Sequence, residues 1–238
     1  MRKNRFKLIA LVFLVQLCLP SATRQAMAQT GKVAYPAMAP MDEYLIPNEN
    51  SEIALARSAA PASISDGAEV MVLGRKGFTT AVKGTNGFLC VVERSWDAAT
   101  DAPEFWNPKI RAPICFNPPA ARTFARIFLL KTKLVLEGKS KAEIVAATNS
   151  ALDGKELPAL QPGAMCYMMS KQQYLNDQGR SWHPHLMFLV SGDAAKSWGA
   201  DLPGSPIMAA DDPEERATIL MVWVGKWSDG STAPTMEH

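Results

Sequence analysis

Three short, largely apolar runs follow one another at 69–73, 78–83 and 88–92. Apolar runs of this length, bounded by turn residues, are typical of β-strands. Glycine-containing turns at 74–77 and 84–87 separate the runs, and the second turn contains Asn-Gly, the strongest short hairpin signal. The pattern therefore predicts an N-terminal meander of three antiparallel strands.

Two consecutive helices are predicted after a proline-rich stretch at 95–119, which its prolines should keep irregular. The first helix is expected over 118–137, because proline is tolerated in the first turn and Gly138 ends the apolar period. The second is expected over 140–154, because it begins with the Ser-x-x-Glu pattern of a capping box.

Three C-terminal strands are predicted at 164–169, 186–190 and 218–227. The last is apolar on both faces, which is typical of a strand inside a sheet. The acidic run at 211–215 indicates a helix start, because Pro213 would lie in its first turn. Strands and helices are grouped and do not alternate, so we predict an α+β fold with an antiparallel sheet.

The first 28 residues have the pattern of a secretory signal peptide. A basic head at 2–7 precedes an apolar run at 8–19, and an Ala-Met-Ala sequence ends at Ala28. The apolar run has about 12 residues, whereas a membrane-spanning helix needs about 20. We therefore expect cleavage after Ala28, export to the periplasm or the medium, and no transmembrane segment in the remainder.

Loss of residues 1–28 changes the charge of the chain. Five of the 25 basic residues lie in this segment, so the remaining 210 residues carry 20 basic and 23 acidic side chains. A mildly acidic domain with scattered lysines and arginines has no electrostatic footprint for nucleic acid. Residues 29–47, with three prolines and no apolar period, are expected to form a flexible linker before a single domain at 48–238.

Three cysteines remain after cleavage, and an oxidising compartment would allow one pair to form a disulfide. We predict a Cys90–Cys115 bond, because Cys115 lies in the proline-rich loop, which has no regular structure to hold it. Cys166 lies in an apolar strand and is expected to be a reduced, buried thiol. A nucleophilic role for Cys166 is disfavoured, because catalytic cysteines usually lie in electropositive clefts or at helix N-termini.

His183 and His185 are the candidate metal-binding residues. In an extended segment they face the same side, so both imidazoles could bind one copper or zinc ion with sulfur from the strand at 164–169. The competing interpretation, which we favour, is the start of a strand with the rings bonded to backbone carbonyls. No carboxylate or third histidine lies at a spacing that completes a site, so the sequence requires no cofactor.

Signatures of serine hydrolases, P-loop proteins and dinucleotide-binding proteins do not occur in the sequence. Apolar strands and aromatic residues are plentiful, whereas converging titratable residues are scarce. Our first hypothesis is therefore a non-enzymatic exported domain that binds a small apolar ligand or a partner protein. The alternative is a metal-dependent or hydrolytic enzyme that uses His183 and His185.

Three segments together resemble a group of exported bacterial proteins whose activity is uncharacterised. They are Leu-Ala-Arg-Ser-Ala-Ala-Pro at 55–61, Gly-Thr-Asn-Gly-Phe at 84–88 and Pro-His-Leu-Met-Phe at 184–188. The resemblance covers about residues 50–190. It implies export, and it implies no activity, cofactor or site residue.

Overall fold

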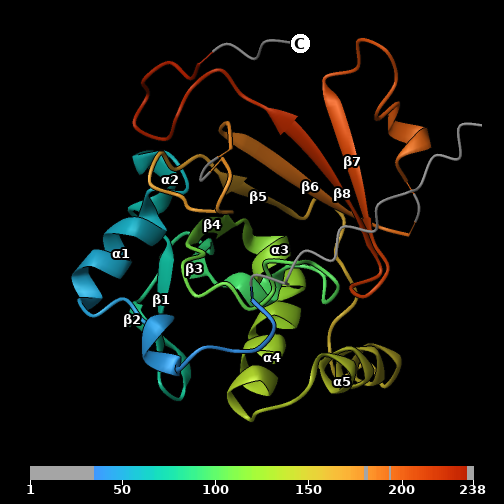
Figure 1. Cartoon of the computed structure of the whole chain (residues 1–238). Helices are drawn as coiled ribbons and strands as arrows, with labels where there is room; N and C mark the ends of the chain where they lie inside the picture. Colours follow the sequence, from blue (N-terminus) through green and yellow to red (C-terminus); the bar gives the residue numbers. More distant parts are fainter. Residues whose placement is uncertain (1–34, 180–181, 193, 235–238) are drawn as a thin grey trace, which may run out of the picture. The chain divides into compact units, whose positions relative to one another are not determined.

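An eight-stranded sheet runs through residues 35–179, 182–192 and 194–234, which the computed structural model describes (Figure 1). Its strand order is β2-β1-β3-β4-β5-β6-β8-β7, and all neighbours are antiparallel except β1 and β3. The predicted α+β class and mostly antiparallel sheet are confirmed. The strands are β1 (Glu69–Gly74), β2 (Gly77–Val82), β3 (Leu89–Glu93), β4 (Ala112–Phe116), β5 (Met165–Met168), β6 (His185–Ser191), β7 (Ile207–Asp212) and β8 (Ala217–Trp223).

Helices cover both faces of the β1–β4 part of the sheet (Figure 1). On one face, Ala56 of α1 packs with Val70 and Cys90. On the other, Phe128 of α4 packs with Leu89 and Ile114. In the described part of the chain the α-helices are α1 (Glu49–Arg57), α2 (Ala62–Ser65), α3 (Pro118–Arg122), α4 (Phe124–Leu136) and α5 (Lys141–Asp153).

The helix expected over 118–137 is two helices in the structure, which meet at Thr123. The Thr123 backbone is non-helical, with φ −122° and ψ −83°, and its hydroxyl donates to the Pro119 carbonyl at 2.7 Å. A side chain that bonds a preceding carbonyl competes with the helical hydrogen bonds, which accounts for the break. The predicted capping box of α5 is present, with Ser140 and Glu143 bonded to each other.

The predicted N-terminal meander is wrong at its third strand. β3 pairs in parallel with β1, with Glu69 opposite Leu89, and the chain between β2 and β3 passes the start of β1. The turn at 84–87 docks there, because the Thr85 amide donates to the Gly67 carbonyl at 2.7 Å. A Cβ on Gly84 would lie 2.3 Å from the Glu69 nitrogen, so only glycine fits this approach.

Two further strands lie where the sequence favoured other structure. β4 lies inside the stretch that was expected to be irregular, and β7 ends at Asp212 inside the expected helix start. The Asp212 carboxylate accepts from the Glu215 amide at 2.9 Å and closes the turn into β8. Four strands therefore follow the helices instead of three, and β8 lies between β6 and β7 as an inner strand.

The described part of the expected linker, 35–47, packs against the domain. A 3-10 helix, η1 (Met41–Glu43), precedes Tyr44, which is fully buried and donates to the Trp106 carbonyl at 2.8 Å. Burial of this aromatic ring beside Trp96 outweighs the weak local periodicity of the segment. The proposed signal peptide lies outside the described residues.

No helix in the described part of the chain is both long enough and apolar enough to cross a membrane.

The predicted Cys90–Cys115 disulfide is present, and Cys166 is a buried free thiol. Cys115 does not lie in a loop as expected. It is directly opposite Cys90 in the β3–β4 ladder, on the face that α1 covers. The register of two antiparallel strands therefore brings the two sulfur atoms together.

We expect a Cys90→Ala/Cys115→Ala double variant to lose about 3–4 kcal/mol of unfolding free energy, because the bond links residues 25 apart in sequence. Urea denaturation with and without reductant measures this loss. A Cys166→Ala control should respond to reductant as the unmodified protein does. Equal urea midpoints for the unmodified protein in both conditions would contradict the prediction.

Candidate functional site

Four side chains on one face of β5, β6 and β8 come together near one end of the sheet. Met168 is paired with His185 across β5 and β6, and Met187 is paired with Met221 across β6 and β8. Because residues two apart in a strand face the same side, all four share a face. They line a pocket of about 360 Å³, here named the His185 pocket, which is large enough for a small organic ligand.

A polar wall of the His185 pocket comes from the end of β3 and a 3-10 helix, η2 (Ser95–Asp97). Trp96 anchors this wall, because its ring is buried in the core and its Nε1 donates to the Thr132 hydroxyl of α4 at 3.0 Å. Glu93, Ser95 and Asp97 border the pocket beside this anchor. None of these three residues was predicted from the sequence to belong to a functional site.

The two carboxyl groups of this wall, Glu93 and Asp97, have raised pKa values. Burial raises the pKa of Glu93 to about 8, with a further contribution from the charge of Glu215. Burial and the charge of Glu93 raise the pKa of Asp97 well above its ordinary value. Glu93 is therefore mostly protonated at neutral pH. Among the described residues, the Asp97 Oδ1 and Ser95 Oγ atoms are buried without a hydrogen-bond partner.

Lys131 of α4 lies next to this wall, and its ammonium group already donates hydrogen bonds to other residues. Its Nζ donates to Glu215 Oε1 at 2.9 Å and to the carbonyls of Asp97 and Ala98 at 3.3 Å. Burial lowers the pKa of Lys131, but the charges of Glu215 and Asp97 outweigh burial and raise it overall. Lys131 therefore stays charged, and its charge partly offsets the rise in the pKa of Glu93.

His185 lines the pocket, whereas His183 does not. The His185 Nδ1 lies 2.8 Å from the His183 carbonyl, which assigns the hydrogen to Nδ1 and leaves Nε2 as an acceptor. Burial lowers the pKa of His185, so this imidazole is neutral at pH 7. The His185 and His183 rings lie 5.3 and 5.8 Å from the Trp223 ring.

The described residues contain no cluster of three His, Cys, Asp or Glu side chains that could hold a metal ion. Cys166 lies on the same face of the sheet as His185, but it is fully buried and does not line the pocket. Burial, and then the charge of Glu93, raise the pKa of the Cys166 thiol well above its ordinary value. The structure therefore brings His185 together with methionines and acids, and not with a reactive thiolate.

Comparisons of this chain with protein-family models, with curated proteins and with solved structures found no match.

Proposed function

We propose that this protein is a non-enzymatic, exported binding domain that takes a small, largely apolar ligand into the His185 pocket. The observation that carries the proposal is the methionine wall formed by Met168, Met187 and Met221. Methionine side chains are flexible and polarisable, so they adapt to the shape of an apolar ligand. Trp182 adds an aromatic surface and is 42% exposed, as expected at a pocket mouth.

A second cavity, of about 420 Å³, borders Leu152 of α5 and Leu157. None of the residues that carry a buried, unpartnered polar atom in the described chain lines this cavity, whereas two of them, Ser95 and Asp97, line the His185 pocket. Buried polar groups are normally paired, so unpaired ones mark a place where a ligand completes the hydrogen bonding. We therefore favour the His185 pocket.

Export is part of the proposal. It is supported by the signal-peptide pattern of residues 1–28 and by the Cys90–Cys115 disulfide, since disulfides persist in oxidising compartments. The alternative, an enzyme that uses both histidines, has weaker support, because His183 does not border the pocket.

Binding of two shape-matched probes, 4-phenylbutan-1-ol and 4-phenylbutylamine, tests the proposal by isothermal titration calorimetry. We expect at least one probe to bind saturably at one site, with a Kd of about 0.1–1 mM for a ligand of this size. A Met187→Trp variant should fill the pocket and weaken binding at least tenfold, as an order of magnitude for lost pocket contacts.

Leu202→Trp is the matched control, because Leu202 is 61% exposed and does not line the pocket. This variant should bind as the unmodified protein does. Absence of binding for both probes, or equal binding by the Met187→Trp variant, would refute the proposed function.

A further inference from the structure

We propose that the ligand of the His185 pocket carries a positively charged amine, which binds the Glu93 and Asp97 carboxylates while its apolar part lies against the methionines. This inference rests on the proposed function, since it names the ligand class of the same pocket. It follows from the charges that border the pocket, from its unpaired polar atoms and from its apolar wall.

Among the residues that the structure describes, no free cation lines the pocket beside its acidic groups. Glu93, Asp97 and Glu104 line the pocket, and of the described lysines and arginines only Arg94 does so. The Arg94 guanidinium is already hydrogen-bonded to other groups, because its Nε donates to the Tyr44 carbonyl at 2.7 Å and its Nη2 donates to Glu52 at 2.9 Å. The described lining therefore favours a cationic ligand over an anionic one, because a cation stabilises the ionised form of these carboxyl groups.

Two unpaired atoms of the polar wall match an ammonium group. Ser95 is 2% exposed, and its Oγ has no partner among the described residues. Asp97 Oδ1 is also unpaired, whereas Oδ2 accepts from the Arg94 amide at 3.0 Å. An ammonium has three hydrogens to donate, which equals the number of acceptor groups offered by Ser95 Oγ, Asp97 Oδ1 and the Glu93 carboxylate.

The apolar wall fits the remainder of an organic amine better than it fits a bare ion. Met168, Met187 and Met221 offer no oxygen ligands, and the described residues hold no cluster able to bind a metal ion. Trp182 at the mouth can place its ring against either a hydrocarbon or a cation. An amine with a hydrocarbon tail uses every part of this pocket.

Binding of an amine to this pocket should release a proton, which distinguishes it from binding of a neutral ligand. The charges of Glu215 and of Lys131 on α4 act on Glu93, and the charge of Glu93 acts on Asp97 of η2 and Cys166 of β5. The other charged or titratable groups that line the described pocket are Arg94, Glu104 and His185. Glu93 holds its proton below about pH 8 in the free protein. An ammonium that pairs with the Glu93 carboxylate must displace this proton, whereas a neutral alcohol does not.

Calorimetry with 4-phenylbutylamine and 4-phenylbutan-1-ol therefore tests the inference. The amine has a pKa of about 10, so it is charged throughout the range from pH 6 to 8.5. Because the pKa values of both Glu93 and Asp97 are raised, the affinity of the amine should rise with pH below about pH 8, with release of at least one proton at pH 6.5. The affinity of the alcohol should not rise with pH.

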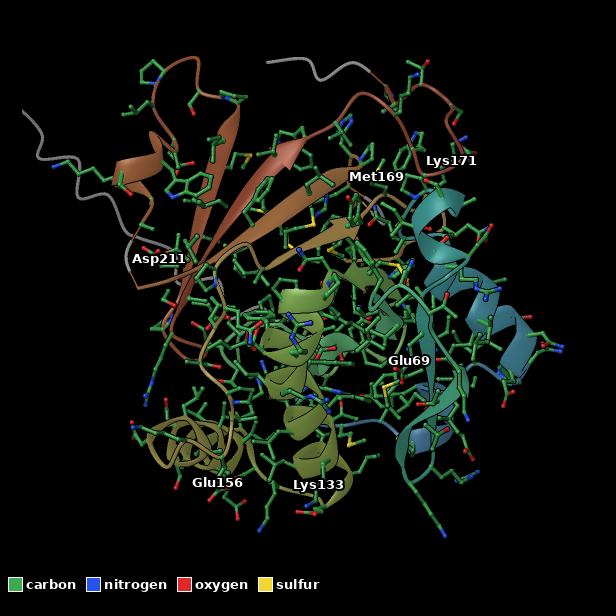
Figure 2. The ribbon with its side chains drawn as sticks, turned by 180° about the vertical axis from the view of Figure 1, so that it is seen from behind. Glu69, Lys133, Glu156, Met169, Lys171 and Asp211 are labelled. Atoms are coloured by element: carbon green, nitrogen blue, oxygen red, sulfur yellow. A yellow bond between two sulfur atoms is a disulfide. The ribbon has the colours of Figure 1, made fainter. Side chains whose placement is uncertain are left out.

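Glu93→Gln should weaken amine binding at pH 8.5 at least tenfold, reduce its pH dependence and weaken the amine much more than the alcohol. This variant should fold, since Glu93 is already mostly neutral at pH 7. Asp97→Asn is the second variant and should also weaken the amine. Glu156→Gln is the matched control, because Glu156 is exposed at the end of α5, far from Met169 at the pocket end of β5 (Figure 2).

The possible outcomes separate the two proposals. Equal affinity for amine and alcohol at pH 8.5, or amine binding that neither Glu93→Gln nor Asp97→Asn weakens, would overturn the cationic ligand and leave an apolar binding site. Absence of binding for both probes would overturn the proposed function itself. Tighter amine binding with proton release, lost in Glu93→Gln, supports both.

Discussion

An Arg94→Met variant is expected to lose about 3–5 kcal/mol of unfolding free energy, as is typical when one partner of a buried ion pair is removed. Arg94 is 1% exposed and lies 2.9 Å from Glu52, which is equally buried. The guanidinium also donates to the carbonyls of Tyr44 and Val92. Methionine can fill the space, but it leaves the buried Glu52 carboxylate without its countercharge, with the Leu73 amide as its remaining donor, and leaves two carbonyls without the guanidinium.

Urea denaturation of the purified variant measures this loss. Arg75→Met is the matched control, because Arg75 pairs with Asp42 at the surface, and exposed ion pairs contribute little to stability. A Glu52→Gln/Arg94→Met double variant should lose less than the sum of its single variants, since the second change removes the uncompensated charge. An Arg94→Met loss below about 1 kcal/mol would show that Glu52 finds another partner or a proton at low cost.

A Lys131→Met variant should lose about 3–5 kcal/mol at pH 8, because Lys131 and Glu215 form the second buried ion pair of the described residues. The loss should depend on pH. The Glu93 pKa is raised from 4.5 to about 8, so between these values the folded protein binds more protons than the unfolded chain, and stability falls as pH rises. Lys131 limits this fall by lowering the pKa values of Glu93 and Asp97.

The Lys131→Met loss should therefore be smaller at pH 5, where the carboxyl groups are protonated, than at pH 8. Urea midpoints at both pH values measure the difference. Lys133→Met is the matched control, because Lys133 lies two residues further along α4 (Figure 2) with a side chain that is 71% exposed. A loss that is equal at both pH values would show that the acid cluster does not depend on Lys131.

Local patterns in the sequence predict most strands and helices, but not how the strands are ordered. The Asn-Gly turn at 84–87 indicates that the chain reverses, and it does not indicate which edge of β1 the next strand joins. β7 was missed because it is an edge strand that ends in two aspartates, so its apolar period is weak. β4 was missed because Pro113 argues against an inner strand, although all five residues of β4 are buried.

The candidate site was only partly predictable for a related reason. His185 is noticeable because histidine is rare in this chain, with three in 238 residues. Glu93 and Asp97 are two of 23 acidic residues, and no local pattern distinguishes a buried carboxyl from an exposed one. Only the registers of β3 through β6 bring these acids to His185, about 90 positions away in the sequence. The local alternation of apolar and polar residues does not show which strands pair when they are this far apart in the sequence.

The disulfide encloses the polar wall of the pocket within a covalent ring. Glu93, Ser95, Asp97 and Glu104 all lie between Cys90 and Cys115, as does the Trp96 anchor. Oxidation therefore fixes both ends of the segment that would hold the ligand, and reduces the entropy that this segment would lose on binding. We therefore expect the ligand proposed for the His185 pocket to bind more weakly after Cys90 and Cys115 are reduced.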